Sequence, residues 1–181
     1  MNVHHQTRIV LRAPEPSDID ILYKWENDEK IWSVSNIITP FSKHTLSKYI
    51  ENSHIDLYES KQLRLMIDVI EGDDSRKRTI GTVDLFEFDP FHNRAGIGIL
   101  IGEENDRKKG YASIVLDKII LYAFDTLQLH QLFCNISEEN EESLMLFKKK
   151  GFNVTGTKKE WLKTKNGFKD EYTLQIINPN D

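Results

Sequence analysis

The residues that most directly suggest chemistry form a basic loop with a glycine, Arg107-Lys108-Lys109-Gly110-Tyr111-Ala112. The loop lies between an apolar run that predicts a buried strand, Ala95–Ile101, and a run that predicts a long helix, about Lys109–Thr126. The first N–H groups of a helix have no intrahelical acceptor, and the helix dipole adds partial positive charge there. Because Gly110 carries no Cβ, a ligand can approach the backbone closely. The loop therefore predicts a phosphate site, with an ordinary strand-to-helix turn carrying solvated lysines as the alternative.

The composition around this loop is typical of one globular domain, residues 1–181. Hydrophobic residues make up 39% of the chain, and no apolar run approaches the roughly 20 residues of a membrane span, so we expect no membrane partner. The polar start, Met1–Arg8, has no apolar signal core, and Cys134 lies alone in an apolar run. We therefore expect a core thiol and a cytoplasmic protein. A net charge of −5 argues against a nucleic-acid partner and is compatible with a cationic acceptor.

Hydrophobic periodicity and turn residues predict the elements that must position the loop. Meandering strands come first and a strand–helix–strand crossover lies in the middle, so the fold class is α/β or α+β, a mixed sheet with helices on its faces. Ser17 is the expected N-cap of the first helix, and Ile31–Phe41 is expected to be irregular. The strands are Thr7–Ala13, Leu63–Ile70, Thr79–Phe88, Ala95–Ile101, Gln131–Ile136, Val154–Trp161 and Glu171–Ile177, and the helices are Ser17–Asn27, Ser42–His54, Lys109–Thr126 and Asn140–Lys149.

A second motif follows the crossover. It begins Asn140-Glu141-Glu142-Ser143 and continues through Leu146-Phe147-Lys148-Lys149-Lys150-Gly151-Phe152. This motif, the Arg-x-x-Gly-x-Ala loop, the separation between the two and the order of the elements carry a resemblance to a known family. The chain resembles the GCN5-related N-acetyltransferase superfamily over roughly Arg8–Ile177. The two motifs match its coenzyme A pyrophosphate motif and its second coenzyme motif. Within it, the chain looks most like the branch of spermidine/diamine and ribosomal-protein N-terminal acetyltransferases, through Ile9–Arg12 with Asp18, Ile80–Leu85, His92–Ala95 and Asn166–Asp170.

The resemblance implies acetyl-CoA as co-substrate and a layout for binding it. Main-chain groups of Ile99, Leu100 and Ile101 would bind the pantetheine amides like an added strand, where the sheet splays from Gln131–Ile136. Asn140 would hydrogen-bond the pantetheine, with a plain helix N-cap as the alternative. The backbone N–H groups that would cradle the pyrophosphate belong to Arg107, Lys108, Lys109, Gly110, Tyr111 and Ala112, and the three basic side chains could add charge.

Catalysis in the superfamily is usually direct transfer to a neutral amine, which needs proton removal, an oxyanion contact and often a tyrosine as acid. Phe147 occupies the position of that tyrosine and cannot donate a proton. Ser143, one turn earlier, is the nearest hydroxyl, with a solvated serine or a coenzyme contact as the alternative. The family's frequent glutamate falls at Gly96. Gly96 and Gly98 are costly inside a strand and indicate a bulge or the close approach of a ligand.

The remaining carboxylates that could handle the amine proton are Asp84, Glu87 and Asp89. In a regular strand, Asp84 points to the opposite face from Glu87 and Asp89, so only one set faces an acceptor cleft unless a bulge intervenes. Asp84 or Glu87 is the candidate for amine binding or proton relay, against solvent-facing charges as the alternative.

The acceptor pocket of this family falls near Trp25 and Trp32, where a ring could hold a cation while Glu26, Asp28 and Glu29 add negative charge. The alternative is core packing for Trp25 and partial burial for Trp32. The six histidines show no metal-ligand spacing, so we expect no metal.

These features predict acetyl transfer to a primary amine, most directly a polyamine or diamine such as spermidine. Acetylation of a protein N-terminus is the second hypothesis. An acyl-CoA-binding regulator with little catalysis is a third, motivated by Phe147 and Gly96, and a mixed α/β domain without a coenzyme site is the fourth. The fold often pairs through its C-terminal strands, which makes a homo-oligomer an open expectation.

Overall fold

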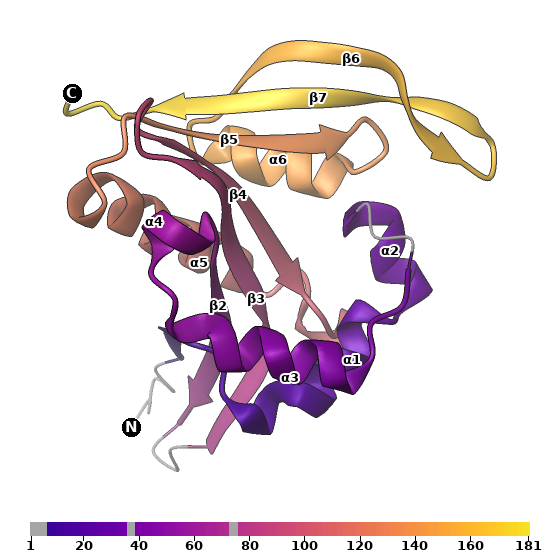
Figure 1. The fold of residues 1–181 in the computed structure, drawn as a ribbon. Helices are drawn as coiled ribbons and strands as arrows, with labels where there is room; N and C mark the ends of the chain where they lie inside the picture. Colours follow the sequence, from indigo (N-terminus) through magenta and orange to yellow (C-terminus); the bar gives the residue numbers. More distant parts are fainter. Residues whose placement is uncertain (1–6, 36–38, 73–75) are drawn as a thin grey trace, which may run out of the picture.

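The computed structural model describes residues 7–35, 39–72 and 76–181. These residues form one sheet with the strand order β1-β2-β3-β4-β5-β7-β6, in which β4 and β5 are parallel and every other neighbouring pair is antiparallel. Figure 1 shows the β6–β7 hairpin projecting past the rest of the molecule. The strands are β1 Arg8–Arg12, β2 Leu63–Glu71, β3 Arg76–Asp89, β4 Arg94–Ile101, β5 Gln131–Ser137, β6 Asn153–Thr164 and β7 Gly167–Ile177.

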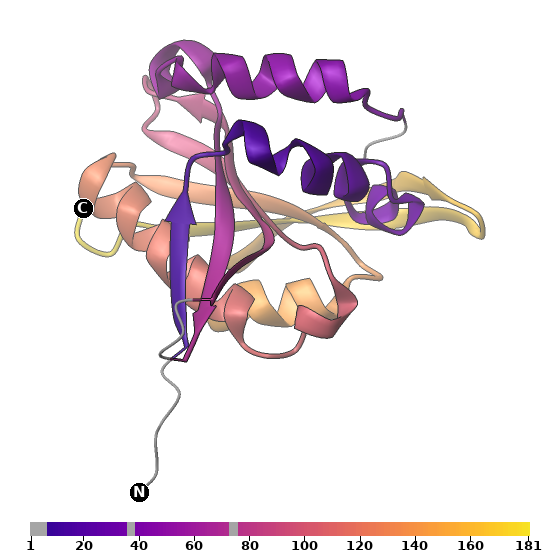
Figure 2. The same cartoon turned by 90° about the horizontal axis from the view of Figure 1, so that it is seen from below.

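Helices cover both faces of the sheet, as Figure 2 shows. The helices from the first third of the chain lie on one face, and those from the second half lie on the other. On the first face are α1 Ile19–Glu26, α2 Glu29–Ser35, α3 Lys43–Glu51 and α4 Leu57–Ser60; on the second are α5 Tyr111–Leu121, which continues as a π-helical turn over Tyr122–Thr126, and α6 Glu141–Lys149. No helix in the described ranges is long and apolar enough to cross a membrane.

Two hydrophobic cores hold these layers together, one on each face of the sheet. In β2, Met66 packs with Leu22 and Trp25 of α1, whereas its neighbour Ile67 packs in the core that contains α5. Successive side chains of a strand point to opposite faces, so neighbouring apolar residues of one strand can serve both cores. The mixed sheet with helices on both faces agrees with the predicted fold class.

Strands β4 and β5 pair over a short stretch only. The register joins Arg94 to Gln131, Ala95 to Leu132 and Gly96 to Phe133, and then the two strands separate. On its other edge, β4 stays paired with β3 as far as Ile101. The sheet is therefore splayed next to the second half of β4.

Two local predictions were wrong at the N-terminal side. Ser17 is not the helix N-cap, because Pro16–Asp18 forms a 3-10 turn and α1 begins at Ile19. Arg12 draws the Asp18 carboxylate inwards through an ion pair of 2.6 Å, and the same carboxylate accepts the N–H of Glu15 at 2.7 Å. This interaction fixes the turn before the helix.

The segment predicted to be irregular, Ile31–Phe41, instead begins inside α2. The backbone carbonyl of Asp28 accepts the N–H groups of Ile31 and Trp32, and its side chain accepts the N–H of Lys30 at 2.9 Å. Ile31 is buried and anchors the helix in the core with α1. Residues 36–38 of this prediction lie outside the described residues.

Candidate active site

A cavity of about 640 Å³ lies where β4 and β5 separate. Its walls come from the second half of β4, the basic loop with the first turn of α5, the end of β5, and α6. The structure thereby brings together two motifs that lie about 30 residues apart in the sequence. The predicted site residues that line the cavity are Ile99, Leu100, Ile101, Arg107, Lys108, Gly110, Tyr111, Ala112, Asn140 and Ser143.

Gly110 shapes the start of α5 at this cavity. It is the N-cap residue and has a φ of +82°, a left-handed conformation that glycine adopts without a steric penalty. A Cβ at Gly110 would meet nothing within 4 Å, so the backbone there is open on that side. The N–H groups of Tyr111 and Ala112, in the first turn, have no intrahelical acceptor by helix geometry. The loop therefore presents donors and partial positive charge to the cavity.

The three basic side chains of the loop have different partners. Arg107 donates through Nε to the carbonyl oxygen of Ile101 at 3.2 Å, and Lys108 pairs with Glu142 of α6 at 2.8 Å. Both residues of the second pair line the cavity. Lys109 does not line it and lies 3.4 Å from Asp106. Of these three side chains, Arg107 and Lys108 are therefore the ones at the cavity.

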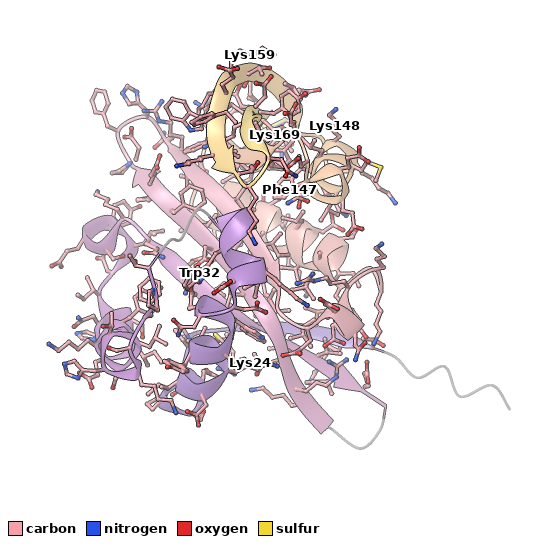
Figure 3. All side chains as sticks on the ribbon, turned by 90° about the vertical axis from the view of Figure 1, so that its right-hand side faces the viewer. Lys24, Trp32, Phe147, Lys148, Lys159 and Lys169 are labelled. Atoms are coloured by element: carbon pink, nitrogen blue, oxygen red, sulfur yellow. The ribbon has the colours of Figure 1, made fainter. Side chains whose placement is uncertain are left out.

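Helix α6 supplies the opposite wall. The Oδ1 atom of Asn140 accepts the N–H of Ser143 at 3.2 Å, so the N-cap alternative for Asn140 is confirmed, while its contact with a coenzyme stays a prediction. Phe147 lines the cavity, is 3% exposed and packs edge-on against Phe152 with ring centroids 5.1 Å apart. Figure 3 shows Phe147 turned towards the middle of the molecule while Lys148 points outwards.

Comparison with known proteins identifies the family. The model of the acetyltransferase (GNAT) domain matches residues 8–153 of this chain. The chain belongs to the GNAT acetyltransferase family. It is 29% identical to an uncharacterized N-acetyltransferase, p20, of Bacillus licheniformis over 98% of this chain and 97% of that protein. It is 25% identical to the spermidine N(1)-acetyltransferase of Vibrio cholerae over 94% of each chain.

Solved structures share the fold of this acetyltransferase. The crystal structure of the Vibrio cholerae spermidine N-acetyltransferase in complex with CoA and spermine superposes with a TM-score of 0.82 at 24% identity, covering 93% of this chain and 95% of that chain. A dodecameric structure of that enzyme in an intermediate state has a TM-score of 0.75 and covers 93% of each chain. The predicted family, fold class and N-acetyltransferase activity are confirmed.

Asp84 of the acetyltransferase lies outside the cavity lining, in a cluster of charges. Arg64 donates to Asp84 at 2.6 Å and to Glu26 at 2.5 Å, and its guanidinium lies 5.5 Å from the ring centroid of Tyr49. The charge of one arginine is shared by two carboxylates that sequence reasoning assigned to the acceptor. This geometry favours a structural role for Asp84, and its role with an amine stays a prediction.

Glu87 also lies outside this lining, and the bulge that could change its direction is present. The β3–β4 register shifts between Phe86 and Asp89, and Glu87 has a φ of +49°. It lines a second groove, of about 580 Å³, together with Asp89 and Phe133. Bulges re-aim side chains, and Glu87 at this bulge lines the second groove and not the cavity between β4 and β5.

The two glycines of β4, Gly96 and Gly98, have different surroundings. A Cβ at Gly96 would lie 2.3 Å from the ring of Phe86 on β3, so the close approach there is made by a neighbouring side chain and not by a ligand. A Cβ at Gly98 would meet the same ring at an ordinary 3.6 Å, and Gly98 does line the cavity. A glutamate at position 96 would therefore require Phe86 to move.

The tryptophans of the expected acceptor region are held by the protein itself. Trp25 is 1% exposed and donates through Nε1 to Glu103 at 3.2 Å. Trp32 is partly buried and donates through Nε1 to the carbonyl oxygen of Glu26 at 2.6 Å. The core alternative therefore holds for Trp25.

Cys134 lines the cavity but is unsuited to forming an acyl intermediate. The thiol is 3% exposed, and burial raises the pKa of Cys134 to about 12. A thiol with this pKa stays protonated at neutral pH, and the thiolate is the nucleophilic form. Direct transfer between coenzyme and acceptor fits this site better than transfer through Cys134.

No sequence pattern pointed to one of the cavity residues, Glu171 of β7. It is 3% exposed and lines the cavity beside Leu162 and Phe147. In the sequence it shares a polar alternation with Thr173 and Gln175, which is typical of a solvent-facing strand surface. Only the pairing of β7 with β5 places its carboxylate at the cavity.

Proposed function

We propose that this acetyltransferase transfers the acetyl group of acetyl-CoA to a primary amine of a polyamine or diamine, such as spermidine. The observation that carries the coenzyme half is the cavity along the unpaired edge of β4, with the N-terminus of α5 among its walls. The acceptor half is supported by the spermidine N(1)-acetyltransferase of Vibrio cholerae, which this chain matches over 94% of each protein.

The cavity suits the chemical parts of acetyl-CoA. A pyrophosphate carries negative charge and would accept hydrogen bonds from the N–H groups of Gly110, Tyr111 and Ala112, close to Arg107 and Lys108. Pantetheine is an extended chain with two amides, so it would pair with the main chain of Ile99–Ile101 like an added strand. The thioester would then lie deeper in the cavity.

The transfer step requires a neutral amine nitrogen. The nitrogen attacks the thioester carbonyl carbon, the new C–N bond forms as the C–S bond breaks, the coenzyme thiolate leaves, and the surplus proton on the new amide nitrogen passes to water. The ammonium form of the acceptor must first lose a proton to a carboxylate or to water. Phe147 offers no proton to the leaving thiolate, so Ser143 or water would supply it. A thiolate is a stable leaving group, so the loss of a tyrosine acid does not stop the reaction.

The test is release of free coenzyme thiol from acetyl-CoA against spermidine, spermine, short diamines and peptides with free N-termini. We expect turnover with the polyamines and diamines and little with the peptides. Turnover with peptides alone would replace this proposal with N-terminal acetylation. Coenzyme that binds tightly in calorimetry, with no thiol release for any amine, would contradict transfer to polyamines and favour a regulator.

The Gly110→Trp variant tests the coenzyme half on its own. The indole would fill the open side of the loop at the N-terminus of α5 and force a left-handed conformation on a bulky residue. Binding of coenzyme A by calorimetry should weaken at least tenfold. An unchanged affinity would refute the phosphate cradle, whatever the acceptor is.

We also propose that the protein forms a homo-oligomer. Strand β6 is at the edge of the described sheet, and the apolar side chains of Val154 and Phe168 on the hairpin are 42% and 59% exposed. Exposed strand edges with apolar residues are places where chains associate. Light scattering at micromolar concentration should give a mass above that of one chain, and a monomer would refute the proposal.

A further inference from the structure

The buried carboxylate of Glu171 forms an ion pair with a lysine of the neighbouring strand. Its Oε2 atom lies 2.8 Å from the Nζ atom of Lys158, which enters from the neighbouring strand β6. The Glu171 side chain is 4% exposed, whereas the Lys158 side chain is 37% exposed. A buried carboxylate requires a cation or hydrogen-bond donors to offset its lost hydration. Lys158 supplies this cation from the solvent-exposed side of the strand, so its ammonium has access to water.

Three different groups surround the Lys158 ammonium. Besides Glu171, it donates to the Oδ1 atom of Asn135 at 3.3 Å. The ring centroid of Trp161 lies 5.2 Å from Nζ, within the range of a cation–π interaction. A carboxylate, an amide oxygen and an aromatic face are the groups that bind a primary alkylammonium. We name Glu171, Asn135 and Trp161 the ammonium cage.

A β-bulge builds this cage. Two residues three apart in a regular strand point to opposite faces, so Trp161 could not lie over Lys158. The β6–β7 register shifts between Lys158 and Leu162, and Glu160 has a φ of +49°. Asp170 holds the bulge by accepting the N–H of Glu160 at 2.9 Å. The backbone is therefore kept in an uncommon conformation that brings the ring to the ammonium.

The ammonium cage is continuous with the candidate active site. Glu171 and Asn135 line the same cavity as Ser143 and Phe147. An acceptor with two amines could place one of them at the thioester and the other in the cage. A lysine side chain ends in a primary alkylammonium, which is the same chemical group as the end of a diamine. Lys158 is therefore suited to stand in for one end of the acceptor.

We infer that Glu171, Asn135 and Trp161 bind the non-reacting ammonium of a diamine or polyamine acceptor, and that Lys158 occupies this subsite until the acceptor displaces it. The inference deepens the proposed function and rests on it. Lys158 competes with the acceptor, so the affinity for diamines is lower than the cage alone would give. A monoamine has no second ammonium and is indifferent to the cage.

The test compares 1,4-diaminobutane with butylamine in the thiol-release assay. Lys158→Met removes the competing ammonium and keeps most of the side-chain stem, so the KM for the diamine should fall about fivefold with little change in kcat. Glu171→Gln should raise it at least tenfold. The KM for butylamine should change less than twofold in both variants. Trp161→Leu should raise the diamine KM a few-fold. Because Trp161 is 60% exposed, this substitution puts folding at little risk, and it tests the cage even if Glu171→Gln does not fold.

Lys159→Met is the matched control. Lys159 is the next residue on β6, is exposed, and pairs with Asp170 at 2.5 Å. Figure 3 shows it at the outer surface of the hairpin. Its substitution removes one positive charge from the same strand, while Asp170 still accepts the N–H of Glu160 through its other oxygen, Oδ1. The bulge and the cage remain, so the diamine KM should stay within twofold of the parent value.

A binding measurement separates this inference from the proposed function. Calorimetric titration of 1,4-diaminobutane into the protein with bound coenzyme A needs no turnover. Tighter binding to Lys158→Met than to the parent supports the cage even if no amine releases thiol. An unchanged diamine affinity in Lys158→Met, or equal changes for diamine and monoamine, would overturn the cage while acetyl transfer could still stand.

Discussion

Gly81 offers a sharp test of how the fold supports the end of β4, which lines the cavity. It lies on β3, opposite Ile101 of β4, and is buried. A Cβ at Gly81 would lie 1.9 Å from the carbonyl oxygen of Leu100, whereas real Cβ atoms essentially never approach another heavy atom within 3.0 Å. In Gly81→Ala, either β3 or the end of β4 must therefore move by more than about 1 Å. The obstacle is backbone, which cannot rotate away as a side chain can.

The expected cost follows from the kind of clash. Overpacking a well-packed core typically costs about 1–3 kcal/mol, and a clash with backbone belongs at the upper end of that range. We expect Gly81→Ala to lose about 3 kcal/mol of unfolding free energy. With a urea m-value of about 2 kcal/mol/M, the unfolding midpoint should fall by roughly 1.5 M. Because the clash lies at Leu100, whose main chain we expect to bind the coenzyme, coenzyme A should also bind more weakly in calorimetry.

Gly156→Ala is the matched control on β6. A Cβ at Gly156 would meet nothing within 4 Å, and its φ is not in the left-handed region. At such positions, alanine stabilises by about 0.4–1 kcal/mol by restricting the unfolded chain. A midpoint for Gly81→Ala within 0.3 M of the parent would refute the reasoning. A loss in Gly156→Ala as large as that in Gly81→Ala would also refute it.

Three further predictions concern residues already placed. Arg12→Met should cost about 3 kcal/mol at pH 7, because the buried Asp18 loses its ion pair and Asp68 keeps only that with Lys77. Burial alone would raise the pKa of Asp18 and Asp68, but hydrogen bonds from Arg12 and other donors hold both pKa values below the ordinary 3.8. The stability that these carboxylates contribute is therefore present above pH 3.8 and is lost as the pH falls through their lowered pKa values. Urea midpoints of the parent and the variant should differ at pH 7 and converge on acidification, and a constant gap would contradict this. Cys134 should react with iodoacetamide at pH 8 far more slowly than a free cysteine, because burial raises the pKa of its thiol to about 12; rapid labelling in mass spectrometry of the folded protein would argue against this. Phe147→Tyr should preserve or raise kcat in thiol release, and a large loss at an unchanged melting temperature would show that the added hydroxyl meets a packed wall.

The parts of the site that could be predicted from the sequence depend on residues that are close together in the chain. The basic loop before α5 and the Asn140–Ser143 turn before α6 each carry their own signals, a glycine in one and a capping asparagine in the other. Local backbone geometry suffices to create helix N-termini at those positions. The fold then needs only the crossover between β4 and β5 to bring them together.

The parts that were missed depend on contacts between distant segments. Helix α2 has only seven residues, and the burial of Ile31 against α1 is needed to hold it. Gly96 is required by a ring on the adjacent strand, which no local pattern reveals. Glu171 reaches the cavity through the pairing of β7 with β5, and the bulge near Glu160 decides which side chains join it. Register and bulges are set by the assembled sheet, so a single strand does not encode them.

The short junction between β4 and β5 divides the sheet into two hydrogen-bonded ribbons, one from β1 to β4 and one from β5 to β7. Separating the ribbons breaks three residue pairs, whereas opening either ribbon internally breaks many more. Amide hydrogens at the junction should therefore exchange with solvent through small local openings, sooner than those inside β3. An extended ligand along β4 would bridge the ribbons and slow this exchange. The donor substrate would then serve for the length of each turnover as a piece of the protein's own secondary structure.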